Sequence, residues 1–337
     1  MAMETPASAW YDRGPSMQSV VVSRVLRLGV RPIVNRVPPS ALAIRTARTV
    51  TDAVTRLLRV DPRVRVEPIR DPQVESGGSR ALSGEWLCPA DPGAPQEKGA
   101  ILYLHGGGFV ICSPQTHRPI TSRLALDTGL PVLVPNYRLA PEHPFPAALD
   151  DAMDAYRWLL ARGIPASRIV VAGDSAGGHL AASLICEASR TGLPVPAGAV
   201  LYSPWVDLTC ELSTERDPSA PDPYLSPVMA REAGRHYVGQ SDFTDPRLSL
   251  LTRTWGPSLP PFLIQVGGAE MLRTEAERLA QLLTDAGADC ELQVWPGQMH
   301  VFQLLHRFLP ESRAAMQETA RFITSAIGPA TVIEAVA

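Results

Sequence analysis

Eight short apolar segments, most of them followed by a stretch with helical periodicity, constrain this chain more than any other feature. Strands that alternate with helices predict a parallel sheet, because parallel neighbours need a crossover connection. The later segments are nearly continuous apolar runs, which is typical of strands that are buried on both faces. The predicted strands cover residues 64–69, 81–87, 100–106, 131–137, 168–174, 198–204, 261–268 and 290–297.

Helices are expected in the connections between these strands and after the last one. The first two strands, polar at alternate positions and not separated by a helix, predict an antiparallel edge. The pattern therefore predicts an α/β fold with an eight-stranded, mostly parallel sheet and helices on both faces. The predicted helices cover residues 146–162, 176–190, 274–286 and 302–326.

Two regions do not follow this alternation and are candidates to cover the strand ends. Residues 17–60 predict two amphipathic helices joined by a hinge at Pro38 and Pro39. The arginines of the first helix are expected opposite its apolar side. A basic amphipathic helix could lie on a membrane, but packing on its own protein is favoured. Residues from about 208 to 250 form an insertion dense in proline, aspartate and serine.

Composition excludes several classes of function. The 337 residues carry a net charge of −3, which gives no field to recruit nucleic acid or an acidic membrane. The first fifteen residues lack the pattern of a secretory signal, and no apolar run reaches the roughly 18 residues of a membrane span. We expect a cytoplasmic protein with free thiols, because its scattered cysteines lack metal-ligand spacing. The cysteines are Cys88, Cys112, Cys186, Cys210 and Cys290.

The first candidate for chemistry is the segment GDSAGG, residues 173–178, at the end of a predicted strand. Ligands of open α/β sheets bind at the carboxyl ends of the strands. Ser175 lies between two glycines in the G-x-S-x-G pattern of a nucleophile elbow, a sharp turn that exposes the serine hydroxyl. The strand before the motif and the helix after it make the pattern specific, so Ser175 is the predicted nucleophile.

The second candidate is HGGGF, residues 105–109, which follows another predicted strand. Alone, three glycines could be a flexible turn. Together with an elbow serine, they predict a loop whose backbone N–H groups bind the oxyanion of a tetrahedral intermediate. The predicted donors are the N–H groups of Gly107, Gly108 and Ala176.

The base and the acid are predicted from their place along the chain. His300 follows the last strand and can reach the carboxyl edge of the sheet, whereas His306 is expected inside the next helix. The order Ser, acid, His then selects Glu270, after the seventh strand, as the acid. Alternatively, Glu270 is a glutamate at a helix N-terminus that is stabilised by the dipole of the helix that follows. Asp285 and Asp289 compete for the role but are expected at the opposite edge.

These motifs, with YRLAPEHPFPAALDD (137–151) and SPWVDLT (203–209), resemble the hormone-sensitive lipase family of α/β hydrolases over about residues 60–327. The resemblance implies an α/β-hydrolase catalytic domain over 61–337, covered by an N-terminal helical cap segment over 1–60 and a cap insertion at about 208–250. It also implies an esterase that favours short acyl chains. Many members have Asp-Pro-Leu where this chain has Glu270, Met271 and Leu272. In the other shared motifs, Glu142 and Asp174 are interpreted as structural.

The predicted reaction is ester hydrolysis through an acyl-enzyme, with Ser175 as nucleophile, His300 as base and Glu270 as the orienting acid. It needs no metal or organic cofactor, and its partner is a small-molecule ester. Exposed apolar helix faces could support a homodimer. The alternatives are an amidase or deacetylase with the same triad and a non-catalytic ligand-binding receptor on a hydrolase scaffold. That receptor type has lost the histidine that is retained here.

Overall fold

The computed structural model describes residues 14–34, 36, 40–55, 60–71, 82–90, 98–256 and 258–328. The predicted hinge at Pro38 and Pro39 therefore lies outside the described residues, and so do all but the last two of the first fifteen residues. Within them, no helix is long and apolar enough to cross a membrane. The same residues contain no group of three or more His, Cys, Asp or Glu side chains that could hold a metal ion. All five cysteines are free.

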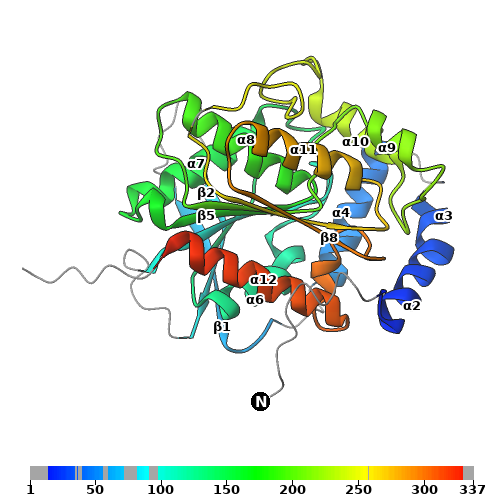
Figure 1. Cartoon of the computed structure of the whole chain (residues 1–337), viewed down its shortest axis with the longest axis horizontal. Helices are drawn as coiled ribbons and strands as arrows, with labels where there is room; N and C mark the ends of the chain where they lie inside the picture. The colour runs from blue at the N-terminus through cyan, green and yellow to red at the C-terminus, as the bar shows by residue number, and fades with distance from the viewer. Residues whose placement is uncertain are drawn as a thin grey trace, which may run out of the picture.

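A single eight-stranded sheet forms the centre of the molecule, with the strand order β1-β2-β4-β3-β5-β6-β7-β8 (Figure 1). The strands from β4 to β8 pair in parallel. By contrast, β1 pairs antiparallel with β2, and β2 with β4. The predicted fold class and its antiparallel edge are confirmed. The strands are β1 Val64–Asp71, β2 Leu82–Pro89, β3 Ala100–Leu104, β4 Val132–Pro135, β5 Ile169–Asp174, β6 Gly198–Tyr202, β7 Phe262–Gly267 and β8 Cys290–Trp295.

Helices cover both faces of this sheet, with α7, α8 and α11 on one face and α6 and α12 on the other (Figure 1). Successive strand residues point to opposite faces, so Leu102 lies in the first core and Ile101 and Tyr103 in the second. All three are fully buried. The helices are α6 Arg118–Thr128, α7 Ala147–Ala161, α8 Ala176–Arg190, α11 Arg273–Asp285 and α12 Pro310–Ile327, with 3-10 turns at η2 Pro114–His117, η3 Ala166–Arg168 and η4 Phe302–Leu305.

The last helix begins later than the sequence predicted. The predicted helix over 302–326 is replaced by the 3-10 turn η4, a short loop and then α12, which begins at Pro310. Proline suits the first turn of a helix because it has no N–H group and its φ is already near the helical value. The prediction is therefore wrong for residues 302–309, and His306 lies in the turn before the helix rather than inside it.

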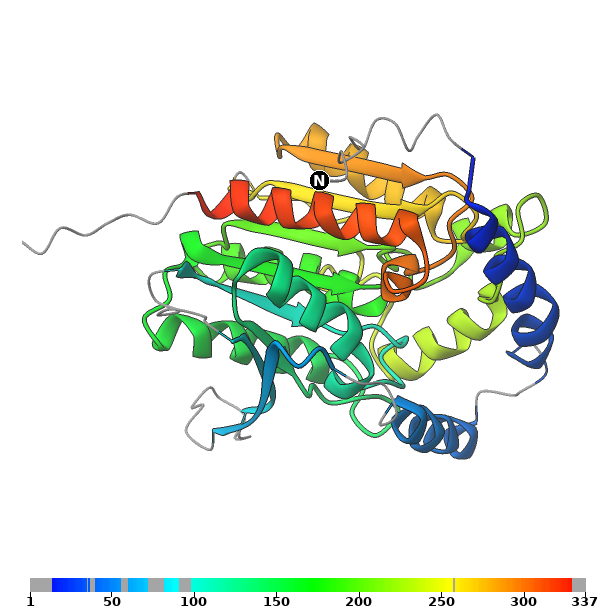
Figure 2. The ribbon, with the colours of Figure 1, turned by 90° about the horizontal axis from the view of Figure 1, so that it is seen from below.

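The N-terminal helices and the insertion both lie toward the carboxyl ends of the parallel strands, where the arrowheads in Figure 2 point. The insertion, which carries no strand, contains two helices. A π-helical turn continues the first N-terminal helix. These elements are α2 Met17–Val25, η1 Leu26–Val30, α3 Arg31–Val34, α4 Ala41–Thr55, α9 Glu211–Arg216 and α10 Pro227–Val238.

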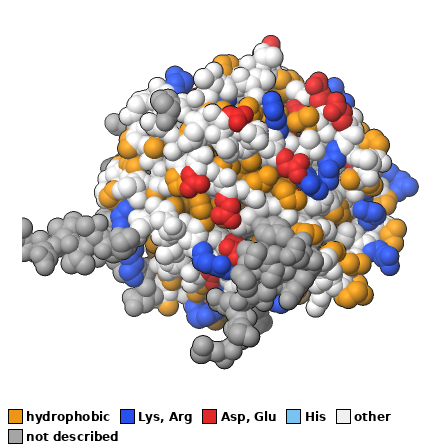
Figure 3. Space-filling model, viewed as in Figure 1, with side chains coloured by type: hydrophobic (Ala, Val, Ile, Leu, Met, Phe, Trp, Pro, Cys, Tyr) orange, Lys and Arg blue, Asp and Glu red, His pale blue; other side chains and the backbone are white. Residues whose placement is uncertain are grey.

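Helix α2 packs on the body of the protein with one apolar face and exposes another. Val22 and Leu26 contact the core cluster that contains Trp295 and Phe302. The outer face is also apolar, and Figure 3 shows hydrophobic side chains beside basic ones along the edge where α2 and α3 lie. The predicted separation of an apolar side from a basic side is therefore incomplete. The exposed large apolar residues of α2, η1 and α3 are Met17, Val20, Val21, Val25, Leu28 and Ile33.

Candidate active site

Ser175 lies between β5 and α8, at the carboxyl end of a central strand. Its backbone has φ 54° and ψ −119°, a strained conformation for a residue with a side chain. The two flanking glycines permit the turn, because a Cβ on Gly173 would overlap Gly177 and one on Gly177 would overlap the Leu104 carbonyl. Ser175 is half-buried while its neighbours are buried. The chain thus adopts the backbone of the predicted elbow.

Main-chain hydrogen bonds fasten this elbow to the neighbouring strand β6 and the loop that follows it. The Ser175 N–H donates to the Tyr202 carbonyl at 2.9 Å, and the Ser175 carbonyl accepts from the Trp205 N–H at 3.0 Å. Both backbone polar groups of Ser175, its N–H and its carbonyl, are therefore hydrogen-bonded, which stabilises the strained turn.

The loop after β3 also has a backbone that requires glycine. Gly107 has φ 111° and Gly108 has φ 62°, and both are half-buried. Within the described part of the chain, no hydrogen bond uses the N–H groups of Gly107, Gly108 or Ala176. The three predicted donors are therefore available to an oxygen atom of a ligand.

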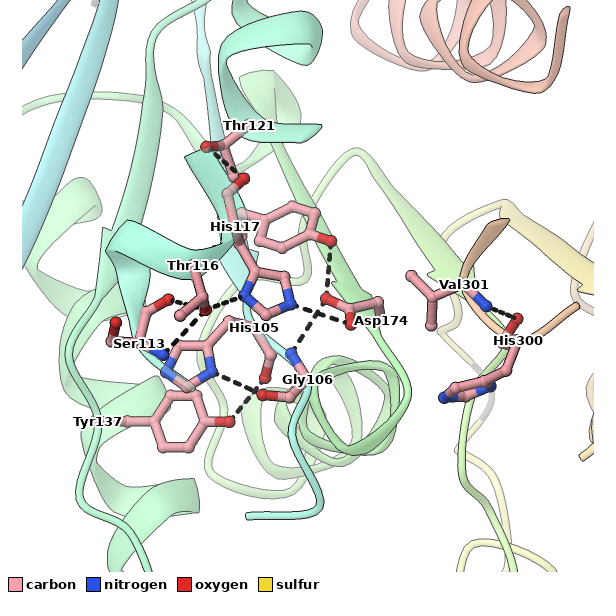
Figure 4. A network of polar contacts seen from close by, with 12 residues as sticks. His105, Gly106, Ser113, Thr116, His117, Thr121, Tyr137, Asp174, His300 and Val301 are labelled. Atoms are coloured by element: carbon pink, nitrogen blue, oxygen red, sulfur yellow. Dashed lines mark hydrogen bonds and ion pairs between the residues drawn. The ribbon is translucent and has the colours of Figure 1, made fainter. Parts of the chain in front are cut away.

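Asp174 joins the elbow to this glycine loop (Figure 4). Its Oδ1 accepts hydrogen bonds from the Gly106 N–H at 3.0 Å and from the Tyr103 hydroxyl at 2.7 Å. The Nε2 atom of His117 lies 3.2 Å from Oδ2. Burial alone would raise the pKa of Asp174, but the charge and hydrogen bond of His117 hold it below its ordinary value. These contacts give Asp174 the structural role that the sequence indicated.

His117 is the residue of this network that the sequence analysis missed. Its Nδ1 atom lies 2.8 Å from Thr116 Oγ1, so both ring nitrogens have partners. The neighbouring His105 stacks on Tyr137 with ring centroids 4.2 Å apart, and burial lowers its pKa to about 3. His117 belongs to no local motif, so only the fold identifies it as the partner of Asp174.

The structure brings Glu270 and His300 together. They follow β7 and β8, which are parallel neighbours, and Glu270 Oε2 lies 3.2 Å from His300 Nδ1. Burial alone would lower the pKa of His300, but the hydrogen bond and charge of Glu270 raise it above its ordinary value. Burial raises the pKa of Glu270, and the hydrogen bond with His300 opposes that effect. The negative charge of Glu270 therefore stabilises the protonated form of His300.

The competing acids lie at the other edge of the sheet. Asp289 immediately precedes β8, and its carbonyl accepts from the N–H of Phe262, the first residue of β7. Asp285 ends α11 and accepts a hydrogen bond from Gln281. Neither carboxylate is placed to reach His300, which follows the opposite end of β8.

Comparisons with known proteins identify the family of the chain. The family model described as the alpha/beta hydrolase fold matches residues 101–304. An acetyl-hydrolase of Streptomyces hygroscopicus is 40% identical over 248 residues, which are 73% of this chain and 81% of that protein. An esterase of Acinetobacter venetianus is 34% identical over 286 residues, covering 84% and 90%.

A solved structure extends the likeness over almost the whole chain. The crystal structure of an esterase from the bacterial hormone-sensitive lipase family superposes with a TM-score of 0.80 at 32% identity. The match covers 94% of this chain and 100% of that one. The chain belongs to the hormone-sensitive lipase family of α/β hydrolases.

Proposed function

We propose that this protein is a serine carboxylesterase that hydrolyses short-chain acyl esters through Ser175, His300 and Glu270. The observation that carries the proposal is the buried contact of 3.2 Å between Glu270 and His300, at the sheet edge where the elbow presents Ser175. The likeness to proteins named esterase and acetyl-hydrolase makes the chain a carboxylic ester hydrolase. The acetyl group in one of these names supports a preference for short acyl chains.

In the proposed reaction, Ser175 Oγ attacks the ester carbonyl while His300 Nε2 accepts the hydroxyl proton. Glu270 accepts the hydrogen bond from Nδ1 and stabilises the imidazolium. The free N–H groups of Gly107, Gly108 and Ala176 receive the oxyanion. His300 then protonates the leaving alcohol, and a water molecule releases the acyl group from Ser175 by the same steps.

We also propose that residues 1–60 and the insertion at about 208–250 act together as a cap over a catalytic domain that spans 61–337. The two regions contact each other, because Arg31 of α3 donates to both carboxylate oxygens of Asp217 at 2.7 and 2.8 Å. Helix α4 also contacts the catalytic domain, because Arg48 pairs with Glu142 of the loop after β4 at 2.9 Å. A cap at this edge would set the length of acyl chain that reaches Ser175.

The test compares kcat/KM for p-nitrophenyl butyrate in the parent, Ser175→Ala and Glu270→Gln, after circular dichroism has shown that all three are folded. Ser175→Ala should lower kcat by roughly a million-fold. Glu270→Gln should lower it by roughly 100- to 10,000-fold, because the imidazole loses its orienting anion. A Ser175→Ala protein that keeps the parental rate would refute the proposal, and an unchanged Glu270→Gln would remove Glu270 from it.

A further inference from the structure

The insertion contacts the backbone of both loops that carry the proposed acid and base. Arg216, at the end of α9, donates from Nε to the Glu270 carbonyl at 3.0 Å and from Nη2 to the Gly268 carbonyl at 3.1 Å. Farther along the insertion, the Tyr224 hydroxyl donates to the His300 carbonyl at 2.8 Å. The two loops are therefore linked to each other through the insertion as well as through their own contact.

Asp222 lies at the centre of this link and is fully buried. Its Oδ1 accepts from the N–H groups of Tyr224 and Leu225, both at 2.8 Å, and its Oδ2 accepts from the Met271 N–H at 3.0 Å. One carboxylate thus fixes the tyrosine that contacts the base and the residue that follows the acid. Only a side chain with two acceptor oxygens satisfies all three donors, because an amide has one.

The charge of Asp222 also acts on the base. Burial lowers the pKa of His300, and the carboxylates of Glu270, Asp222 and Asp174 raise it, Glu270 most strongly. The aromatic ring of Tyr224 faces the imidazole with centroids 6.0 Å apart. A change at Asp222 therefore alters both the geometry and the electrostatics around His300.

We propose that Asp222 is a positioning residue that orients Glu270 toward His300 through the Met271 N–H and through Tyr224. The inference rests on the proposed function of Glu270 and His300. It extends to the N-terminal helices, because Nη1 of Arg31 donates to the Asp222 carbonyl at 2.5 Å. The cap thus aligns the acid and base that it covers.

The test is Asp222→Asn, which keeps the shape of the side chain, removes its charge and places an NH2 group opposite the Met271 N–H. The matched control is Asp242→Asn in an exposed part of the same insertion, where the carboxylate accepts from the Thr244 N–H at 2.9 Å. Asp222→Asn should lower kcat for p-nitrophenyl butyrate by roughly 10- to 100-fold with little change in KM, since small misplacements of reacting groups are costly. The control should leave both constants unchanged.

The pH dependence separates positioning from a merely structural role. Loss of the Asp222 charge lowers the pKa of His300, so the acid limb of the kcat/KM profile should move to lower pH in Asp222→Asn. Titration of the His300 imidazole by NMR should show the same shift without any turnover. Unchanged kcat, or a loss of kcat without a shift in the pKa of His300, overturns the inference while the proposed function stands.

The two proposals fail in different ways. A parent protein that does not hydrolyse the ester overturns the proposed function, while the NMR titration still decides the effect of Asp222 on His300. If Asp222→Asn does not fold, Tyr224→Phe replaces it, because that change removes only the hydroxyl bond to the His300 carbonyl. We expect Tyr224→Phe to lower kcat without changing the fold, and a parental kcat in this variant overturns the inference.

Discussion

The proposed nucleophile and the proposed acid–base pair of this site are held in place by different parts of the molecule. Ser175 and the glycine loop belong to the sheet, where Asp174 accepts hydrogen bonds from Gly106 and Tyr103 of the adjoining β3 segment. Glu270 and His300 also lie at strand ends, but their backbone carbonyls are held by side chains of the insertion. The insertion also touches the first half, because Tyr237 of α10 stacks on Phe109 of the glycine loop with ring centroids 3.6 Å apart. The difference is that side chains of the insertion donate hydrogen bonds to the backbone of the second half.

This difference indicates which part of this chain tolerates substitution without loss of the proposed chemistry. A nucleophile with a strained backbone needs a rigid scaffold, and a buried sheet provides one. The loops that close over a site can vary more, because they lie on the surface. Here the insertion contributes to alignment, so a change in the insertion is expected to alter rate as well as specificity.

The largest loss of activity is expected from His300→Ala, in the acid–base pair whose loops the insertion contacts. Ser175 would lose its base, and kcat for p-nitrophenyl butyrate should fall by roughly a million-fold. The melting temperature should also fall, because Glu270 is fully buried and loses its ion-pair partner, so the assay is run where circular dichroism shows that the variant is folded. His306→Gln is the control and should keep the parental kcat, since His306 lies in the turn before α12.

A smaller loss of activity is expected from Gly107→Ala, in the glycine loop that follows β3. An added Cβ would overlap the Ile111 carbonyl at a backbone φ of 111°, so the loop must shift its N–H groups. We expect kcat to fall by roughly 100- to 1,000-fold. Gly129→Ala is the matched control, because Gly129 has φ 69° with nothing within 4 Å of the added Cβ. It should cost about 1 kcal/mol of stability and leave kcat unchanged.

Asp174→Asn should affect stability more than rate. The amide oxygen can still accept from Gly106 and Tyr103, but the charge that faces His117 is lost. We expect the free energy of unfolding in urea to fall by about 1–3 kcal/mol. The acid limb of kcat/KM should move less than in Asp222→Asn, since Asp222 raises the pKa of His300 more than Asp174 does. If the acid limb moved further in Asp174→Asn than in Asp222→Asn, the assignment of Asp174 to the elbow rather than to the acid–base pair would be contradicted.

The smallest effect is a displacement of the pH profile of the parent enzyme. The base must be neutral to accept a proton, so kcat/KM should fall as the pH drops through the pKa of His300. Because Glu270 raises that pKa, the midpoint should lie above the ordinary histidine value of 6.5. A pH-stat assay at constant ionic strength measures it. A midpoint below 6.5 would mean that burial outweighs the charge of Glu270.

The sequence predicts the sheet and the elbow because both depend on local patterns. Continuous apolar runs specify buried strands, and small residues around Ser175 specify the turn. The chain order Ser, acid, His selected Glu270 and His300, and their contact follows from the parallel pairing of β7 with β8. The order of the strands in the sheet was not predicted. The late start of α12 was missed because the apolar residues of η4 continue the helical periodicity.

The positioning residues could not be predicted from the sequence. Asp222 acts on a residue 49 positions away and Tyr224 on one 76 positions away. Both lie in an insertion whose composition predicts loops and nothing about which loop side chains point inward. His117 likewise reaches Asp174 across 57 positions. Only the folded chain shows that these side chains meet.

The antiparallel edge of the sheet has a consequence for self-association. An outer strand presents unpaired N–H and C=O groups that can recruit a strand from another molecule and start aggregation. Strand β1 carries Pro68, which has no N–H group to offer, and an exposed ion pair between Arg65 and Glu67 at 2.6 Å. A second chain would have to desolvate these charges and leave a hydrogen bond unmade. We therefore expect β1 to resist strand addition from other molecules even at high protein concentration.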